Sequence, residues 1–170
     1  MADDFPPLPI APLGKRDRAG FCSGEPVIDD WFHRRAGQDQ RRDVARIFVA
    51  LDGDTIVGFY SLSACSVRFP EMPAAVTAKL PRYGEVPAAL IGRLARDERY
   101  RGRKVGALLL ADAIRRTLAA GQDMAVHAIV IDAKNHRAAD FYRSFGFVPL
   151  EHHSGRMFLT TATAAAFVGK

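Results

Sequence analysis

The segment from Arg96 to Ala107 has the residue types of a turn that could bind phosphate groups. Gly102 and Gly106 would let the backbone approach a ligand closely, and the helix expected after them would offer N–H groups at its start. Positive charge is added by Arg101, Arg103 and Lys104. The segment has neither the Gly-Lys-Ser/Thr ending of a Walker loop nor the G-x-G-x-x-G pattern of a dinucleotide-binding turn. From these residues alone, a pyrophosphate-binding turn and an ordinary basic loop both stay open.

Groups for proton transfer are harder to choose. Tyr142 falls on an apolar helical stripe, so the pattern alone indicates a core tyrosine. Candidates for a general base exist by residue type only, and each is more simply structural or solvated: His127, His136, His152, His153, Glu85, Asp97 and Glu98. An α-amino group has a pKa of ~8, against ~10.4 for lysine, so about a tenth of it is neutral at pH 7. The lack of an obvious base therefore favours an α-amino acceptor over a lysine side chain.

The elements that must position these residues follow the hydrophobic periodicity of the chain. A first helix begins at Ser23 as N-cap, with Pro26 in its first turn, and runs on through Arg42. Its apolar stripe consists of Val27, Ile28, Trp31 and Phe32. The other predicted elements are a hairpin of strands 44–51 and 55–67, strands 89–95, 124–131, 147–150 and 156–161, and helices 105–119 and 135–144. With an extended lead-in over residues 1–12, this order predicts an α/β (α+β) fold with a mixed sheet and helices on its faces.

Length and composition fit one soluble domain over residues 1–170, because hydrophobic residues make up 48% and charged residues 25% of the chain. Cys22 and Cys65 have no metal-ligand partners at close spacing, which indicates a reducing compartment and no metal site. The sequence shows no signal peptide and no apolar run that could span a bilayer, so we expect a cytoplasmic protein without a membrane partner. The net charge of +5, carried mostly by arginine, hints at an anionic partner, although a solvated basic surface explains it equally well.

The C-terminal half resembles the GNAT superfamily of acetyl-CoA-dependent N-acetyltransferases, whose signature R/Q-x-x-G-x-G/A lies between a bulged strand and a helix. Residues Arg101 to Gly106 match its first and last positions, and Lys104 stands where the family usually has glycine. The second hallmark of the family is present as Asn135, Ala138, Phe141-Tyr142 and Gly146-Phe147. The resemblance implies the GNAT fold, with a mostly antiparallel twisted sheet and helices on both faces.

The N-terminal half narrows the resemblance to the GNAT toxins of type II toxin–antitoxin modules. The segments that carry it are 21–24, 46–50, 58–64, 80–83, 86–88 and 92–95, so that it covers nearly the whole chain. Members of that group acetylate the α-amino group of the amino acid on charged tRNA, which blocks translation. The resemblance thus implies acetyl-CoA as cofactor, aminoacyl-tRNA as substrate, a homodimer, and a small ribbon–helix–helix antitoxin as partner.

The resemblance also implies a role for each residue of the site. Leu94, Ala95 and Arg96 would bind the pantetheine arm of acetyl-CoA through their backbone. The pyrophosphate would be held by Arg101, Gly102, Arg103, Lys104, Val105, Gly106 and Ala107. Asn135 would contact the arm of the cofactor, a role that can coexist with capping its helix. Tyr142 would be catalytic, because its hydroxyl, with a pKa of ~10, could hydrogen-bond the departing sulfur or pass it a proton.

Several arginines are candidates for tRNA binding. Arg93 is a charge on an otherwise buried strand and therefore needs a partner, for which an internal salt bridge and the acceptor end of tRNA are equally open. On the first helix, Arg34 and Arg41 are seven residues apart and would share a face, as would Arg35 and Arg42. Such a cluster could follow an RNA backbone. A surface ion pair between Arg34 and the residue four positions before it would explain part of this cluster more simply.

Two other functions stay open at this stage. One is a GNAT acetyltransferase that acts on a small amine or a protein N-terminus, because the half that binds the cofactor would look the same. The other is a non-catalytic nucleic-acid-binding regulator that keeps the fold without turnover. Lys104 at the usual glycine position is the observation that supports it.

Overall fold

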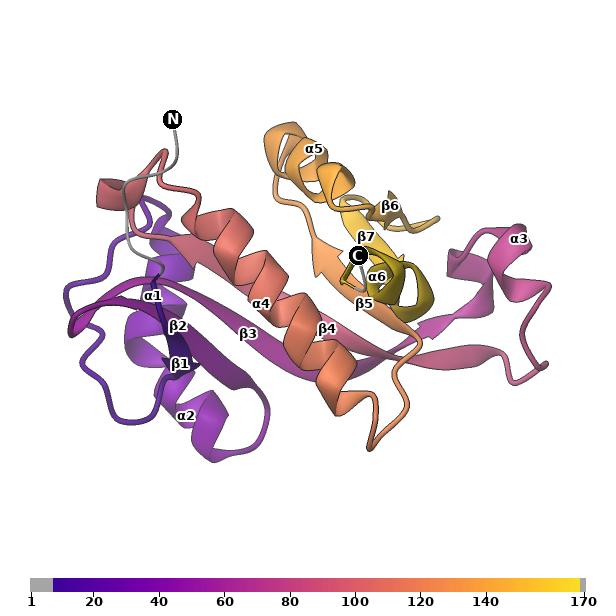
Figure 1. Cartoon of the computed structure of the whole chain (residues 1–170), viewed down its shortest axis with the longest axis horizontal. Helices are drawn as coiled ribbons and strands as arrows, with labels where there is room; N and C mark the ends of the chain where they lie inside the picture. Colours follow the sequence, from indigo (N-terminus) through magenta and orange to yellow (C-terminus); the bar gives the residue numbers. More distant parts are fainter. Residues whose placement is uncertain (1–7, 169–170) are drawn as a thin grey trace. The chain divides into compact units, whose positions relative to one another are not determined.

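The computed structural model describes residues 8–168 (Figure 1). Within this range the chain forms two compact units, and each combines two separate stretches of sequence. The first unit contains residues 8–62 and 93–113, and the second contains residues 63–92 and 114–168. The chain passes from one unit to the other three times, and a single domain over residues 1–170 stays a prediction.

The strands pair in the order β1-β2-β3-β4-β5-β7-β6. Their bounds are β1 Ile10–Pro12, β2 Arg46–Asp52, β3 Thr55–Arg68, β4 Glu85–Arg96, β5 Ala128–Asp132, β6 Val148–Pro149 and β7 Arg156–Thr160. β4 and β5 are parallel, whereas the pairs β1–β2, β2–β3, β5–β7 and β6–β7 are antiparallel. This mixed, mostly antiparallel sheet confirms the predicted fold class.

Six helices and two short 3-10 turns connect the strands in the part of the chain that is described. The helices are α1 Pro26–Arg34, α2 Ala36–Arg41, α3 Ala74–Thr77, α4 Val105–Ala120, α5 His136–Ser144 and α6 Thr161–Val168, and the turns are η1 Phe69–Glu71 and η2 Glu98–Tyr100. Between residues 8 and 168, no helix is both long enough and apolar enough to cross a membrane.

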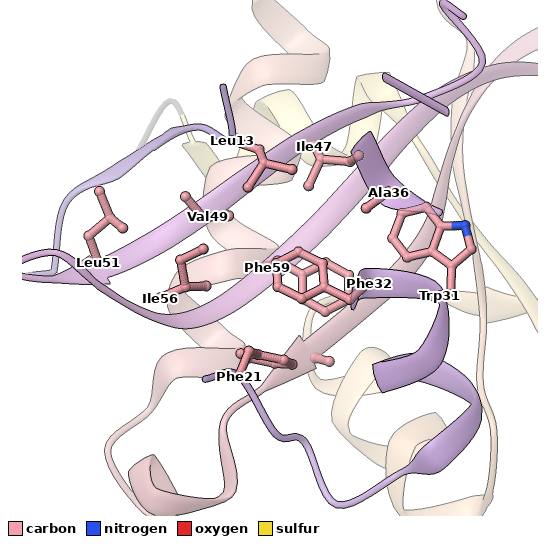
Figure 2. Close-up of a cluster of buried hydrophobic side chains, with 11 residues drawn as sticks. Leu13, Phe21, Trp31, Phe32, Ala36, Ile47, Val49, Leu51, Ile56 and Phe59 are labelled. Carbon is pink, nitrogen blue, oxygen red and sulfur yellow. The ribbon is translucent and has the colours of Figure 1, made fainter. Parts of the chain in front are cut away.

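The core of the first unit is an aromatic stack between α1 and the strands β2 and β3 (Figure 2). Phe59 of β3 lies nearly parallel to Phe32 of α1, with the ring centroids 4.0 Å apart. Phe21 meets both rings edge-on, and Trp31 stacks on Phe59 with 6.0 Å between centroids. Aliphatic residues complete the cluster, among them Leu13, Ile47, Val49 and Leu51. These contacts fix α1 and the loop before it on one face of the strands.

The opposite face of β3 packs on the first half of α4. Side chains alternate along a strand, so Gly58 and Tyr60 point away from the aromatic stack. A Cβ atom at Gly58 would lie 2.9 Å from the side chains of both Val105 and Leu109, so only glycine allows this close approach of strand and helix. Tyr60 donates a hydrogen bond of 2.5 Å to Asp112 of α4. The first unit therefore has helices on both faces of its strands.

The second unit has a core of its own around β5. Residues Ala128 to Ile131 pair with β4 on one side and with β7 on the other, and all four are buried. A continuous apolar run is what a strand covered on both faces requires. The surrounding cluster includes Val67, Met72, Val86, Leu150 and Phe158.

The predicted first helix was wrong at its N-terminus. The helix begins at Pro26 with Glu25 as N-cap. The Ser23 hydroxyl lies before the helix, where it donates to Asp29 at 2.7 Å and accepts the amide of Glu25 at 3.1 Å. Val27 was expected in the apolar stripe, but its side chain is 84% exposed. The buried stripe is thus limited to Trp31 and Phe32, with Ile28 partly buried.

The length predicted for this helix was also wrong, because the helix is interrupted at Arg35, which ends α1 and precedes α2. In a straight helix, residues eight apart are separated by ~12 Å along the axis. Here Asp39 accepts a hydrogen bond of 3.0 Å from the indole nitrogen of Trp31, and the break allows this approach. Two helices, α1 and α2, therefore replace the single predicted one.

Other predicted bounds shift for local reasons. The strand expected from Met124 begins at Ala128, because the amide of Met124 still donates to Ala120 in the turn that ends α4. The predicted lead-in over residues 1–12 contains β1, and residues 1–7 lie outside the described part of the chain. The C-terminal helix α6 was not predicted.

Replacing Phe59 by alanine tests whether the aromatic stack holds the first unit together. We expect Phe59→Ala to lower the free energy of unfolding by ~3–5 kcal/mol, because a fully buried ring leaves a cavity between three other aromatic rings. The matched control is Phe167→Ala, which removes a ring that is 60% exposed. Urea denaturation followed by circular dichroism measures both. Equal effects of the two substitutions would contradict this account of the core.

Candidate functional site

The turn between β4 and α4 presents open backbone to solvent. Gly102 has a φ of +80°, and a Cβ atom built on it would meet no other atom within 4 Å. The next unusual residue is Lys104, whose φ of +58° lies in the left-handed region that favours glycine. Helix α4 starts directly afterwards at Val105, and the first amides of a helix lack an acceptor within it. The turn therefore has the backbone geometry of an anion-binding site.

The conformation of Lys104 gives a physical reason for the glycine that the GNAT pattern has at this position. A side chain in the left-handed region costs roughly 1–2 kcal/mol, whereas glycine adopts it freely. The chain keeps this conformation despite the lysine. The Lys104 side chain is exposed, so its charge lies at the surface of the turn.

The arginines of the turn are in different environments. The guanidinium of Arg103 lies over the ring of Tyr100, 4.5 Å from its centroid. Tyr100 in turn donates a hydrogen bond of 2.6 Å to Asp52, and this hydrogen bond, together with burial, raises the pKa of the phenol. Arg101 is exposed and makes no ion pair within residues 8–168. Arg101 is thus exposed without an ion pair in this range, whereas Arg103 packs on the ring of Tyr100 within the turn.

Asp97, which we expected to be a solvated loop acid, is fully buried. It accepts two hydrogen bonds from the guanidinium of Arg99, at 2.9 and 3.0 Å, and also accepts the backbone amides of Arg99 and Cys22. Burial by itself would raise the pKa of this carboxyl, but the hydrogen bonds from Arg99 and Cys22 outweigh it and lower the pKa. Asp97 is thus a structural carboxylate that ties the turn to the loop before α1. Sequence reasoning missed this role because nothing in the local pattern marks a loop acid as buried.

The end of β4 joins the turn to the core. Ala95 is buried in the aromatic cluster, whereas Leu94 and Arg96 on either side of it are only partly buried. The amide of Asp97 donates a hydrogen bond of 2.8 Å to the carbonyl of Val57, and this bond holds the end of β4 against β3. The three residues predicted to bind the pantetheine arm therefore lie on a rigid strand that runs into the turn.

Arg93 precedes this segment and lies on Trp31. Its guanidinium is 4.0 Å from the centroid of the indole, and its amide donates to Ser61 at 3.1 Å. The residue is exposed and makes no ion pair within residues 8–168, so the internal salt bridge is not formed. Partial burial lowers the pKa of Arg93, with a contribution from the positive charge of Arg35 that the carboxylate of Asp39 opposes.

The four arginines predicted to form one cluster on the first helix do not share a face, because the helix breaks between them. Arg34 pairs with Asp30 at 3.1 Å, as the simpler explanation predicted. Arg35 is at the break, and Arg41 lines a separate pocket. The guanidinium of Arg42 lies next to the side-chain amide of Gln38, whose oxygen accepts at 2.6 and 2.9 Å when the amide is turned to face it. The seven-residue spacing applied only to a continuous helix.

Asn135 and Tyr142 belong to the second unit and lie on α5. Asn135 is the N-cap of the helix and accepts the amide of Ala138 at 2.9 Å. The ring of Tyr142 is buried, with a total exposure of 7%, and makes tilted contacts with Phe141 and Phe147 at 5.6 and 6.1 Å. After α5 the chain turns at Gly146, whose φ is +98°. The packing role that the pattern gave to Tyr142 is therefore real, whatever its hydroxyl does.

Of the histidines considered as general bases, three are engaged or solvated. His153 pairs with Glu71 at 3.2 Å, and His136 and His152 are exposed. The Nε2 atom of His127 is buried and has no hydrogen-bond partner among the described residues. None of these histidines belongs to the unit that contains the turn between β4 and α4.

Comparison with known proteins decides the family, because residues 16–147 match the model of the acetyltransferase (GNAT) family. The chain belongs to the acetyltransferase (GNAT) family. A probable toxin TacT of Sinorhizobium fredii is 31% identical over an alignment of 171 positions, which covers 94% of each chain. A tRNA-acetylating toxin of Mycobacterium tuberculosis is 34% identical over 153 residues, covering 90% of this chain and 91% of the relative.

Solved structures support the GNAT fold independently. AtaT in complex with acetyl-methionyl-tRNAfMet superposes with a TM-score of 0.88 at 24% identity, covering 95% of this chain and 99% of AtaT. AtaTR bound with AcCoA gives a TM-score of 0.82, again at 24% identity, over 95% of this chain and 98% of the other. The Y145F mutant of KacT gives 0.88 at 24% identity, over 95% and 99%. The enzyme class, an N-acetyltransferase, follows from the GNAT family.

Lys104→Gly tests whether the left-handed conformation of Lys104 lowers the stability of the protein. We expect the variant to be as stable as the parent or up to ~1 kcal/mol more stable, because the left-handed conformation no longer opposes a Cβ atom. Acetyl-CoA should bind with an unchanged or lower Kd in isothermal titration calorimetry. A more than tenfold weaker Kd, or ~1.4 kcal/mol, would instead show that the Lys104 ammonium contacts a phosphate.

Asp97→Asn tests the buried carboxylate through pH. The folded-state pKa of Asp97 is depressed, so its stabilisation is present above the unfolded pKa of ~3.9 and is lost as pH falls through the lower folded value. At pH 7 we expect the variant to be ~1.5–3 kcal/mol less stable, the range for hydrogen bonds to charged groups. The difference should shrink as the pH is taken below 4. A difference that does not change between pH 7 and pH 3 would contradict the assignment.

Proposed function

We propose that this protein is an acetyl-CoA-dependent toxin that acetylates the α-amino group of aminoacyl-tRNA and thereby blocks translation. The observation that carries the proposal is the similarity over at least nine-tenths of the chain to relatives named as a probable toxin TacT and a tRNA-acetylating toxin. The match includes the N-terminal half, which contains α1, α2 and the Trp31 ring under Arg93. It is therefore not limited to the half that binds the cofactor in the family pattern. A GNAT enzyme of unrelated specificity would need to share only the latter.

The turn of the first unit fits acetyl-CoA. Gly102 leaves the backbone open, Lys104 keeps the left-handed conformation, and Arg101 is exposed without an ion pair within residues 8–168. These residues, with Arg103 and the first turn of α4 from Val105 through Gly106 to Ala107, would hold the pyrophosphate. The backbone of Leu94, Ala95 and Arg96 would bind the pantetheine arm, and Asn135 would contact the same arm. When bound, acetyl-CoA supplies a thioester whose acyl carbon is attacked by the amine.

Tyr142 is the proposed catalytic residue of this chain. Its ring is buried and packs against Phe141 and Phe147, which positions the side chain that carries the hydroxyl. In the proposed role it donates a hydrogen bond, or a proton, to the sulfur that leaves the acyl group. A thiol with a pKa of ~8.5 is a good enough leaving group for such help to suffice, and an α-amino nucleophile with a pKa of ~8 needs little assistance from a base.

Arg93 is the arginine best prepared to contact the acceptor end of tRNA. The indole of Trp31 supports one face of its guanidinium, and Arg93 remains exposed three residues before β4 ends at Arg96. An arginine held flat in this way loses less freedom on binding, and its outer face can stack on a base or pair with a phosphate. Arg35 adds a second cation close by.

We also propose a homodimer, a ribbon–helix–helix antitoxin as partner, and a cytoplasmic location, where aminoacyl-tRNA is found. An antitoxin partner is supported by the solved AtaT-AtaR and KacTA complexes, each with DNA. Size-exclusion chromatography with light scattering tests the dimer.

Transfer of radiolabelled acetyl groups to charged tRNA tests the function directly. The purified protein is incubated with labelled acetyl-CoA and either aminoacyl-tRNA, the same tRNA without its amino acid, or the free amino acid. We expect labelled RNA only in the first reaction. Hydrolysis of the aminoacyl ester should then release the label from the tRNA as the acetylated amino acid. Equal labelling of the free amino acid would identify a small-amine acetyltransferase, and no labelling with intact acetyl-CoA binding would identify a non-catalytic protein.

Tyr142→Phe separates catalysis from packing. The phenylalanine ring fills the same space, so we expect the Kd for acetyl-CoA to change less than twofold while kcat falls by ~10²–10⁴, the range for loss of a general acid. Tyr83→Phe is the matched control, because it removes the hydroxyl of a tyrosine that is 82% exposed. If Tyr142→Phe keeps a kcat near that of the control, Tyr142 serves only the core.

A further inference from the structure

A basic pocket lies between the loop of residues 14–19 and the two helices α1 and α2, entirely within the first unit. It has a volume of about 840 Å³. Four cations line it, Lys15, Arg16, Arg18 and Arg41, together with His33 and a single acid, Asp17. We propose that this pocket binds the phosphodiester backbone of RNA. The inference deepens the proposed function and rests on it, because that function requires an RNA substrate.

Two guanidinium groups converge inside the pocket over the backbone of Gly37. A Cβ atom at this glycine would lie 2.7 Å from Nη1 of Arg18 and 3.3 Å from Nη1 of Arg41, so these two nitrogens are at most about 6 Å apart. Like charges at such a distance repel each other, and an anion placed between them removes the repulsion. Only a glycine leaves room for this arrangement, since a methyl group would occupy the point of convergence.

No carboxylate neutralises this pair. Neither Arg18 nor Arg41 takes part in an ion pair within the described residues, in contrast to Arg34, Arg46 and Arg99 of the same unit. Asp17 accepts the amide of Ala19 at 2.9 Å, which uses its carboxylate in a local turn. The positive charge of the pocket is therefore available to a ligand.

The pocket is pre-formed, because hydrogen bonds fix the loop to the helices. Arg18 donates to the carbonyl of His33 at 3.3 Å, and Gln40 donates to the carbonyl of Gly14 at 3.1 Å. Both ends of the loop are anchored in the aromatic core by Leu13 and Phe21, which Figure 2 shows on either side of the cluster. A ring nitrogen of His33 also lies 2.8 Å from the carbonyl of Phe21. The loop therefore loses little conformational entropy when a ligand binds.

The lining favours phosphate groups over an acidic peptide. Ala19 is the one residue of the lining whose side chain is purely apolar, whereas protein interfaces have an apolar core. Guanidinium forks match the oxygens of a phosphate, and the exposed Lys15 and Arg16 at the same pocket extend the charge beyond one group. A chain of phosphates is the ligand that uses both features.

The test compares a double substitution, Arg18→Gln with Arg41→Gln, with a control pair that removes the same charge. The control is Arg68→Gln with Arg143→Gln, because each of these arginines already pairs with an acid three residues away. Fluorescence anisotropy with labelled, uncharged tRNA at several salt concentrations gives the Kd and its salt dependence. We expect the pocket variant to bind at least tenfold more weakly than the control, with a salt slope smaller by about 1.5, as for two lost phosphate contacts. A Kd within threefold of the control would overturn the proposal.

Gly37→Ala provides a second measurement that leaves the net charge unchanged. Alanine is a better helix former than glycine, so α2 should persist while the new methyl group separates the two guanidiniums. We expect a severalfold loss of tRNA affinity, and affinity equal to that of the parent would show that the convergence does not bind RNA.

Acetylation assays distinguish failure of the pocket from failure of the proposed function. With aminoacyl-tRNA as substrate, the pocket variants should raise KM and leave kcat unchanged. If the parent binds tRNA through the pocket but does not acetylate it, the function is wrong and the pocket stands. If acetylation proceeds with an unchanged KM in the pocket variants, the function stands and the proposal that the pocket binds RNA is overturned. A parent protein that binds no tRNA contradicts both.

Discussion

Trp31 is the residue on which the charged surface of the first unit depends. Its indole stacks on Phe59 within the core and donates its one N–H to Asp39, which lies beyond the helix break. The same ring supports the guanidinium of Arg93 at 4.0 Å. Figure 2 shows the indole nitrogen pointing away from the other rings of the cluster. One side chain thus links apolar packing, the break between two helices, and an exposed arginine.

The break at Arg35 explains why the arginines of this region have separate environments. A continuous helix would have aligned residues seven apart, and residues 27–42 contain no proline that would argue against one. Only Gly37 hints at a weak point, because glycine is a poor helix former. What fixes the break is tertiary: Trp31 is anchored by Phe59, and Asp39 must reach it. Such a contact cannot be read from the residues of the helix alone.

The same distinction separates what the sequence predicts from what it does not elsewhere in the chain. The hairpin of β2 and β3 and the helices α4 and α5 follow from short-range signals, such as Gly53 in the turn and Asn135 as N-cap, and the structure agrees with them. The GNAT pattern has a glycine at the position of Lys104, and the structure shows the left-handed conformation there, which we did not predict for a lysine. The burial of Asp97 and the convergence of Arg18 with Arg41 could not be predicted, because each depends on a partner distant in the chain or on the course of a loop.

The pairing of individual cations says more about function than the net charge does. In the first unit, Arg34, Arg46 and Arg99 are neutralised by neighbouring acids, so a ligand gains little from them. Arg18, Arg41, Arg93 and Arg101 have no ion pair in the described part of the chain, and each is held or flanked by a structural element that the core positions. An exposed ion pair contributes at most ~1 kcal/mol to stability, so RNA could displace the acid from such an arginine. The displaced carboxylate would nevertheless remain nearby and repel the phosphate. Arginines without an ion pair have no such carboxylate beside them. The fold thus separates the arginines of this unit into those that pair with acids of the protein and those that can bind an anion.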